Sequence, residues 1–443
     1  MCSSDLVQAR VAAAEDPGLA KIGPFIRGGT WRNFRMRYPE ANEMYARMMA
    51  VSERLERIRQ AGPADPAALA EATQALHRGQ CNCPYWHGAF GGIYLPHLRN
   101  AIYRELIAAD RAADRAEGRR GAWVEATTGD YDFDGRIDVR LSSDGIDAWI
   151  APARGGMLYE LDLRDQEHNL LATLDRRPEA YHEQVLAGPG KARSVVDASQ
   201  LAKFKQEGLE RMVRYDVSRR KSLVDHFWDV DVAAAAVVDG TALERGDFAA
   251  GAYEASIRRN PGRIQVLLAR TGNAWGIPFT LSKAITLEAG SRSLEIAYKL
   301  EGLPRDFRQH LAVEFNFAGL PAQAAGRFFH DEAGRDLGEL GLRLDLPQAR
   351  MIGLVDDWLD IDARLSFAAA SNGGSAGVWT FPIQSVSQSE GGFELVHQSV
   401  VVMPHWIVTP DADGVWKTTM RLDLGRFTQR PERPAGTMSH ATA

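Results

Sequence analysis

The spacing of apolar positions divides the chain into a helical part and a later part with strand-like alternation. In residues 43–60, apolar side chains recur three or four positions apart, as on one buried helical face. They are Met44, Met48, Val51, Leu55 and Ile58. A second helix is predicted after the N-cap residue Asp65 and Pro66, and a third over 95–116. Short connections between these helices predict a three-helix domain over residues 39–118.

After Gly121 the apolar period changes to two, which is the period of β-strands. The alternating segments are 136–150, 157–163, 263–268, 294–300, 311–317, 378–381, 392–399 and 415–424. Turn dipeptides lie between many of them, including Asp144-Gly145 and Asp413-Gly414. Such a long stretch of short strands predicts a large antiparallel β-sandwich over 119–429. The expected fold class is therefore multidomain, a small helical bundle followed by a β-sandwich.

The two ends of the chain carry weaker patterns. A short helix is expected around residues 6–15, and residues 430–443 are expected to form a disordered tail. The three cysteines, Cys2, Cys81 and Cys83, form no disulfide framework, which favours a reducing, cytoplasmic location. No stretch approaches the ~20 apolar residues of a membrane span. The net charge of −6 argues against a nucleic-acid partner, which needs a cationic surface.

The densest chemistry lies in residues 80–99, QCNCPYWHGAFGGIYLPHLR. Here Tyr85, Trp86 and His87 stand among glycines between two predicted helices. Glycines allow close approach of a backbone to a ligand, and aromatic rings suit the apolar faces of pyranose sugars. The alternative is an aromatic plug that packs against another domain.

This run, together with RGGTWRNF over 27–34 and RYPEAN over 37–42, resembles the α-amylases and 4-α-glucanotransferases of glycoside hydrolase family 57. The similarity extends from about residue 23 to about residue 424. It includes four further segments, at 155–162, 176–182, 225–227 and 381–394. The sandwich of that family is similar to galactose mutarotase, so a mutarotase-like supersandwich is expected.

The resemblance implies a retaining enzyme that acts on α-1,4-glucans such as maltooligosaccharides or starch. In the family, a Glu nucleophile and an Asp acid/base lie on an incomplete (β/α) barrel, upstream of the segment matched by Trp31. We therefore expect no catalytic residue in this chain. Residues 1–38 are expected to be the remnant of the barrel's end, the missing N-terminal catalytic barrel is the expected partner, and Met1 is expected to lie inside a longer reading frame.

The resemblance also implies a set of substrate-binding residues. Trp31, Asn33, Tyr38 and Glu40 match the last barrel segment, and Tyr85, Trp86 and His87 match a helical segment that folds over the cleft. Interdomain packing is the alternative role for Trp31 and Trp86, and a structural hydrogen bond is the alternative for His87. A non-catalytic glucan-binding module is the alternative function.

Two further clusters lie in the predicted sandwich. Asp130, Asp132, Asp134 and Asp138 alternate around Gly135, which makes them a candidate calcium site. Leu141 replaces the bidentate Glu of an EF-hand, so a solvated hairpin turn is the alternative, and no other cofactor is expected. His310 and Glu314 share one face of a predicted strand, as in a structural pair, a vestigial sugar cleft or a sugar epimerase.

Overall fold

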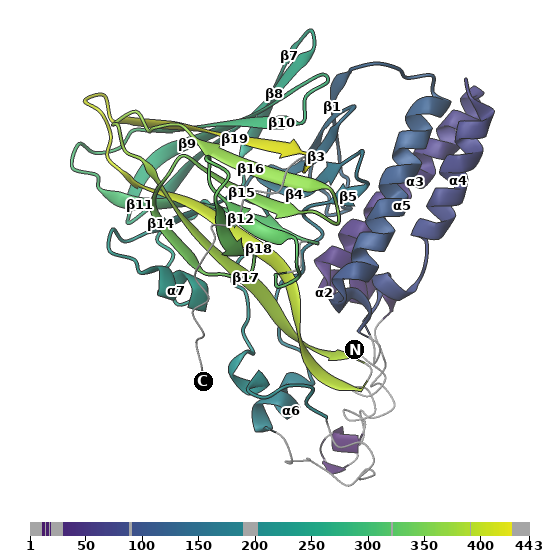
Figure 1. Cartoon of the computed structure of the whole chain (residues 1–443), viewed down its shortest axis with the longest axis horizontal. Coiled ribbons are helices and arrows are strands. Elements are labelled where there is room, and N and C mark those ends of the chain that lie inside the picture. The colour runs from purple at the N-terminus through teal and green to yellow at the C-terminus, as the bar shows by residue number, and fades with distance from the viewer. Residues whose placement is uncertain are drawn as a thin grey trace.

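The computed structural model describes residues 11–13, 15–16, 18, 30–87, 91–188, 203–319, 322–389 and 391–427. In these ranges a bundle of helices stands beside a β-sandwich (Figure 1). Most of the predicted helix at 6–15 and of the segment 1–38 lies outside the described residues, as does the whole tail at 430–443.

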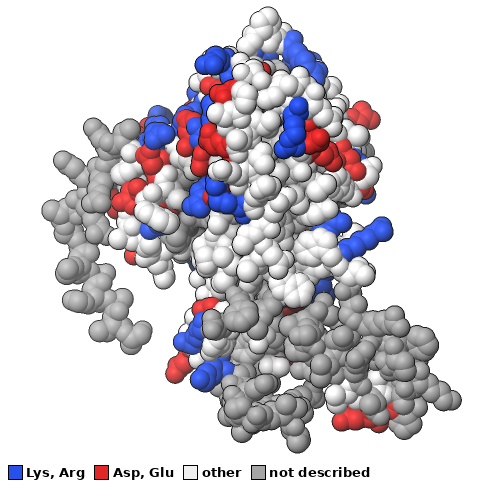
Figure 2. Space-filling view, turned by 90° about the vertical axis from the view of Figure 1, so that its right-hand side faces the viewer, with Lys and Arg blue, Asp and Glu red and all other residues white. Residues whose placement is uncertain are grey.

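Three helices form the bundle, and a short helix leads into it. They are α2 (Trp31–Arg37), α3 (Pro39–Ala61), α4 (Pro66–Gly79) and α5 (Pro96–Ala116). The side chain of Asp65 accepts a hydrogen bond of 3.1 Å from the backbone N–H of Ala68, as expected of the cap. The apolar face of α3 is buried with Leu76 of α4 and Leu106 of α5. Figure 2 looks onto the helical side, where charged side chains gather over the upper part of the molecule.

The strands form three sheets. The first has the order β1-β2-β3-β4-β5, with β1 (Val124–Gly129), β2 (Asp138–Ser143), β3 (Ile146–Ala151), β4 (Met157–Leu163) and β5 (His168–Asn169). The second has the order β13-β12-β15-β16-β19-β10-β9-β8-β7, with β7 (Glu254–Asn260), β8 (Arg263–Ala274), β9 (Ile277–Glu288), β10 (Ser293–Glu301), β12 (Arg327–His330), β13 (Asp336–Glu339), β15 (Met351–Asp356), β16 (Ile361–Phe367) and β19 (Val415–Gly425). The third has the order β14-β17-β18-β11-β6, with β6 (Val224–Trp228), β11 (Gln309–Phe317), β14 (Leu344–Ala349), β17 (Ala376–Ser389) and β18 (Gly392–Val408).

Neighbouring strands within these sheets pair antiparallel. Leu158 and Ser222 exchange backbone hydrogen bonds of 2.8 and 3.1 Å, which places β4 beside the segment that leads into β6. One apolar core takes side chains from all three sheets, for example Leu141, Ile285 and Val402. The predicted fold class, helices followed by an antiparallel β-sandwich, is confirmed.

The burial of β2 and β3 differs from the alternation that the sequence suggests for residues 136–150. Every residue of β3 and all but Arg140 of β2 are buried. These strands lie between the nine-stranded sheet and the helices, so both of their faces are covered (Figure 1). Polar side chains at these positions consequently need partners inside the protein.

A buried ionic cluster joins α3 and α5 to the first sheet, and we call Arg47, Asp110, Asp147, Glu160 and Asp162 the junction cluster. Arg47 lies 2.7 Å from Asp110, 2.7 Å from Glu160 and 3.4 Å from Asp162, and its side chain is 2% exposed. Burial alone would raise the pKa of Asp110, but Arg47, Arg140 and Arg54 hold this pKa well below its usual range. Burial and then the charge of Glu160 raise the pKa of Asp162, so Asp162 keeps a proton to share with Glu160.

The hairpin of β17 and β18 is much longer than its neighbours and runs beyond the sandwich toward the short helix α6 (His182–Ala187) (Figure 1). There Val386 and Phe393 pack with Tyr181, Val185 and Leu209 in a small separate core. The predicted strands at 378–381 and 392–399 are parts of these two longer strands. This hairpin links the sandwich to the segment that carries the aromatic motif.

Candidate functional site

Two exposed tryptophans meet over a buried phenylalanine at the start of the bundle. The ring of Phe34 lies 5.5 Å from that of Trp31, 5.7 Å from that of Trp86 and 4.4 Å from that of Tyr38. Trp31 is 39% exposed and Trp86 is 46% exposed, whereas Phe34 and Tyr38 are buried. We call Trp31, Phe34, Trp86, Tyr38 and His87 the aromatic surface. It offers two open indole faces on a packed base, which is suitable for stacking on flat apolar ligand faces.

Short-range contacts orient the two tryptophans. Asn33 caps α2, because its side-chain oxygen accepts hydrogen bonds of 2.9 and 2.8 Å from the backbone N–H and hydroxyl of Thr30. The backbone carbonyl of Trp86 accepts a 2.8 Å bond from the N–H of Ile93. At Gly92, with φ of 49°, an added Cβ would lie 1.9 Å from that carbonyl, so the turn behind Trp86 needs glycine.

Arg99 fastens this turn to the sandwich. Its side chain, 1% exposed, donates to the carbonyl of Ala172 at 3.0 Å, to the side chain of Gln398 at 2.7 Å and to the carbonyl of Ile93. Gln398 belongs to β18 and in turn donates to the carbonyl of Tyr94 at 3.0 Å. The segment that carries Trp86 is therefore held by a strand of the third sheet.

Glu179 connects the end of α2 with the turn behind Trp86, and its residue type alone did not single it out as a site residue. It accepts hydrogen bonds from the hydroxyls of Tyr38 at 2.9 Å and Tyr94 at 2.7 Å, and it pairs with Arg37 at 3.2 Å. Burial and then the charge of Glu179 raise the pKa of Tyr38, so the phenol stays protonated and donates. The only sequence signal was its position in the segment 176–182, which shares the family resemblance.

His87 lies half-buried among tyrosine rings. Its ring centre is 4.6 Å from that of Tyr94, 5.8 Å from that of Tyr181 and 6.2 Å from that of Tyr38. Its Nδ1 lies 3.2 Å from the carbonyl oxygen of Gly91. His87 thus lies at the edge of the aromatic surface, where its ring packs against the buried tyrosines.

Besides Tyr38, two more of the predicted site residues are buried, Glu40 and Tyr85. Glu40, 2% exposed, accepts hydrogen bonds of 2.6 and 2.7 Å from Arg177 and one of 3.0 Å from the backbone N–H of Asp175. Burial raises its pKa, but Arg177 and then Arg219 outweigh this effect and lower the pKa overall, so Glu40 is ionised. Tyr85 is also buried and donates 2.7 Å to the carbonyl of Gly79. Of the seven predicted residues, the structure thus brings Trp31, Trp86 and Asn33 to solvent.

Three of the four candidate calcium ligands gather in one loop. Asp130, Asp132 and Asp134 each place a carboxylate oxygen within 4.8 Å of the others. Asp132 is paired with Arg154, which supplies part of the positive charge that an ion would bring. Asp138 instead accepts from the N–H of Tyr131 and the hydroxyl of Tyr159, both at 3.3 Å, and burial raises the pKa of Asp138 to about 8. The geometry therefore brings together three carboxylates and leaves Asp138, with its own partners, outside the group.

His310 and Glu314 share a face of β11 but have different partners. Glu314 pairs with Arg220 at 3.0 Å and lies 3.4 Å from His226. Although burial would lower the pKa of His226, hydrogen bonds to Glu244 and Glu314 raise it to about 9. His310 lies 2.9 Å from Nδ1 of His405 instead. Glu314 is accordingly held as an ion pair.

Comparison with known proteins gives a consistent result over most of the chain. Residues 130–420 match the C-terminal domain described as Alpha-amylase/4-alpha-glucanotransferase, and residues 29–113 match the middle domain of the same description. None of the described helices has the length and hydropathy that a membrane crossing requires.

Individual relatives agree. A 4-alpha-glucanotransferase of Thermococcus kodakarensis is 31% identical over 378 residues, which is 85% of this chain and 50% of that protein. Alpha-amylase 1 of Dictyoglomus thermophilum is 28% identical over 90% of this chain and 55% of its own length. The chain thus spans about half the length of the curated relatives that it matches.

One solved structure shows the same fold over most of the chain. The crystal structure of 4-alpha-glucanotransferase from Thermococcus litoralis superposes with a TM-score of 0.69 at 27% identity, covering 94% of this chain and 55% of that chain. A galactose mutarotase-like protein from Clostridium acetobutylicum covers 69% of this chain at 8% identity and a TM-score of 0.40. From the matched middle and C-terminal domains, the chain belongs to the α-amylase/4-α-glucanotransferase family, glycoside hydrolase family 57.

Proposed function

We propose that this chain is the C-terminal portion of an α-1,4-glucan-acting glycoside hydrolase or 4-α-glucanotransferase whose substrate is maltooligosaccharide or starch. The observation that carries the proposal is the aromatic surface, with Trp31 and Trp86 exposed on a packed base in a chain of this family. Retaining hydrolysis needs two carboxyl groups about 5 Å apart around the scissile bond. We assign these groups to a barrel that precedes residue 39 in the whole protein.

In this proposal the site residues divide into contacting and supporting groups. Trp31 and Trp86 stack on the apolar faces of glucose rings, and Asn33 and His87 hydrogen-bond to hydroxyls at the rims. Tyr38, Glu40 and Tyr85 hold the surface from below through Glu179, Arg177 and Gly79. The same proposal assigns residues 1–38 to the end of the barrel, residues 39–118 to the helical domain and residues 119–429 to the sandwich.

A non-catalytic glucan-binding module is the second candidate. The two exposed indoles favour it, because stacking on sugar rings needs no catalytic carboxylate. The two functions share the binding surface and differ in turnover, so one experiment can separate them.

The experiment is incubation of the purified chain with maltopentaose, with products separated by chromatography and binding measured by affinity electrophoresis in amylose. We expect binding without products from this chain. Trp31→Ala and Trp86→Ala should each weaken binding about tenfold. Shorter and longer products would show that the catalytic carboxyl groups lie within this chain.

Trp358→Ala is the matched control, because Trp358 is 79% exposed in the β15–β16 turn of the sandwich. This variant should bind amylose like the unaltered chain. If Trp358→Ala weakens binding as much as Trp31→Ala does, the aromatic surface is not the binding site. Unchanged binding in both Trp31→Ala and Trp86→Ala would lead to the same conclusion.

A further inference from the structure

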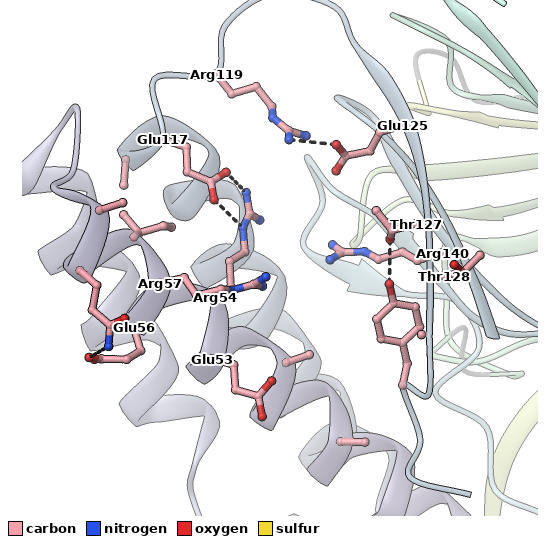
Figure 3. Close-up of a pocket in the computed structure, with 18 of the residues that line it drawn as sticks. Glu53, Arg54, Glu56, Arg57, Glu117, Arg119, Glu125, Thr127, Thr128 and Arg140 are labelled. Atoms are coloured by element: carbon pink, nitrogen blue, oxygen red, sulfur yellow. Dashed lines mark hydrogen bonds and ion pairs between the residues drawn. The ribbon is translucent and has the colours of Figure 1, made fainter. Parts of the chain in front are cut away.

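A groove with a volume of about 1170 Å³ runs between α3 and the first sheet. Figure 3 shows Glu53, Arg54 and Arg57 on the helical wall, and Glu125, Thr127 and Arg140 on the opposite wall. Binding sites for single small ligands usually occupy about 300–1,000 Å³. The groove is therefore large enough for an extended molecule.

The groove follows α3 for most of its length. Its lining on this helix runs from Ala46 to Ala61, which corresponds to about 22 Å at a rise of about 1.5 Å per residue. A groove of this length suits a linear chain better than a compact ligand.

One end of the groove continues into the aromatic surface. Phe133 lines the groove, and its ring lies 6.4 Å from the ring of Tyr45. Tyr45 in turn lies 6.3 Å from Trp31. A row of aromatic rings thus leads from the exposed indole of Trp31 to the entrance of the groove, so that one linear ligand could occupy both.

Phe133 is held in an unusual way. Its φ is 60°, in the left-handed region that bulky residues avoid, and the residue is 50% exposed. The loop around it is fixed by Asp130, which accepts bonds of 3.0 Å from the N–H groups of Asp134 and Gly135, and by Asn42, which donates to the carbonyl of Asp132. An exposed aromatic side chain on a residue with an unfavourable backbone conformation is typical of positions that contact ligands.

The groove walls carry charges that are largely neutralised. Arg54 pairs with Glu117 at 2.6 Å, Arg119 with Glu125 at 3.0 Å, and Arg140 with Asp110 at 2.8 Å. These paired groups still offer hydrogen-bonding atoms, but their combined electrostatic potential is too weak to attract an anionic polymer. The walls therefore suit an uncharged, polar ligand.

The inner part of the groove adds hydroxyl and indole groups. The hydroxyl of Thr127 accepts from Tyr131 at 2.8 Å, which leaves its own hydrogen able to donate. Trp149 also lines the groove and is 1% exposed, and its indole N–H has no hydrogen-bond acceptor among the described residues. Because Trp149 is buried, it forms part of the groove floor, and the exposed Thr127 supplies the accessible hydroxyl.

We propose that this groove is an extension of the glucan-binding surface that holds the part of an α-1,4-glucan chain lying beyond Trp31 and Trp86. The inference rests on the proposed function for the class of ligand, and on the groove's own geometry for its position. Glucose units stack on Phe133 at the entrance, and their hydroxyls exchange hydrogen bonds with the paired side chains along α3 and β1. The groove thereby favours long chains over short ones.

The test compares affinities for maltotriose and for maltoheptaose, measured by calorimetric titration of the full chain. Ala50→Trp fills the groove from α3, where Ala50 is half-buried and lines it. Phe133→Asn removes the entrance ring and leaves a residue that tolerates the left-handed backbone. Each variant should lose about tenfold in affinity for maltoheptaose and keep its affinity for maltotriose.

Ala70→Trp is the matched control, because Ala70 is an exposed position on α4 outside the groove lining. All variants should melt within about 2 °C of the unaltered chain, which excludes a folding effect. Equal affinity for maltoheptaose in Ala50→Trp, Phe133→Asn and the unaltered chain would overturn the groove proposal while leaving the aromatic surface intact.

The converse result separates the two proposals. Loss of maltoheptaose binding in Ala50→Trp, with Trp31→Ala and Trp86→Ala unchanged, would support the groove and overturn the aromatic surface. If the unaltered chain binds neither sugar, both proposals are wrong.

Discussion

Helix α3 packs against two neighbours, and the two interfaces are held by different forces. Toward α4 and α5 it buries Met44, Val51 and Leu55, all between 0% and 2% exposed. Toward the sandwich it presents Arg47 to Glu160 and Asp162 of β4, and Asp110 of α5 completes this part of the junction cluster. The apolar interface tolerates small changes in the relative orientation of the helices, because the free energy gained by burying apolar area depends little on orientation.

The ionic interface is less tolerant. A buried ion pair contributes little net stability, because desolvation offsets the attraction, but removal of one partner leaves an uncompensated buried charge. The junction cluster therefore fixes how the bundle sits on the first sheet, while the apolar interface supplies most of the bundle's stability. The following predictions test this difference, from the largest expected effect to the smallest.

Arg47→Met should cause the largest loss. It leaves Asp110 and Glu160 without the cation that lies 2.7 Å from each, so the free energy of unfolding should fall by about 3–5 kcal/mol. Chemical denaturation monitored by circular dichroism measures this change. A loss below about 1 kcal/mol would mean that water or the other arginines replace Arg47.

Leu55→Ala tests the apolar side of the same helix. Leu55 is 2% exposed, and a buried Leu→Ala change should lower the free energy of unfolding by about 2–4 kcal/mol. The loss should be independent of pH, in contrast to that of a junction variant. A pH-dependent loss would contradict the separation of the two interfaces.

The contribution of Asp162 to the free energy of unfolding should fall as pH rises above about 4, the ordinary pKa of an aspartate. The folded protein keeps the proton of Asp162 because its pKa is raised, whereas the unfolded chain loses that proton, so rising pH favours unfolding. Asp162→Asn can donate to Glu160 without titrating and should flatten the dependence. Denaturation from about pH 5 to about pH 9 measures both slopes. Equal slopes in the two proteins would show that Asp162 is ionised when folded.

Arg59→Gln should have the smallest effect. Arg59 pairs with Glu56 on the exposed side of α3, where both side chains are more than half exposed. The change in the free energy of unfolding should stay below about 0.5 kcal/mol and shrink further with added salt. A loss as large as that of Arg47→Met would remove the distinction between buried and exposed pairs.

The sequence predicted element types well where apolar positions repeat. Helix α3 and strand β4 follow directly from such repeats, at 43–60 and 157–163. Strands such as β7 and β14 were missed because they are mostly exposed or short, which leaves little alternation to detect.

The candidate site was less predictable than the fold. Glu40, Glu43 and Arg47 lie three or four residues apart on α3, a pattern that looks like a solvated face. Partners such as Arg177 and Lys221 lie more than a hundred residues away in sequence, so the local pattern could not show that this face of α3 is buried. The same separation hid Glu179, which contacts Tyr38 across 141 positions.

The bond between Arg99 and Gln398 spans 299 positions of the chain. Contacts between near neighbours form early in folding, whereas the entropy of closing a long loop delays distant ones. The helices should therefore assemble long before strand β18 reaches the turn behind Trp86. During refolding, compact chains will precede chains in which the turn behind Trp86 is fixed, and the delay between them will measure how long the sandwich takes to close.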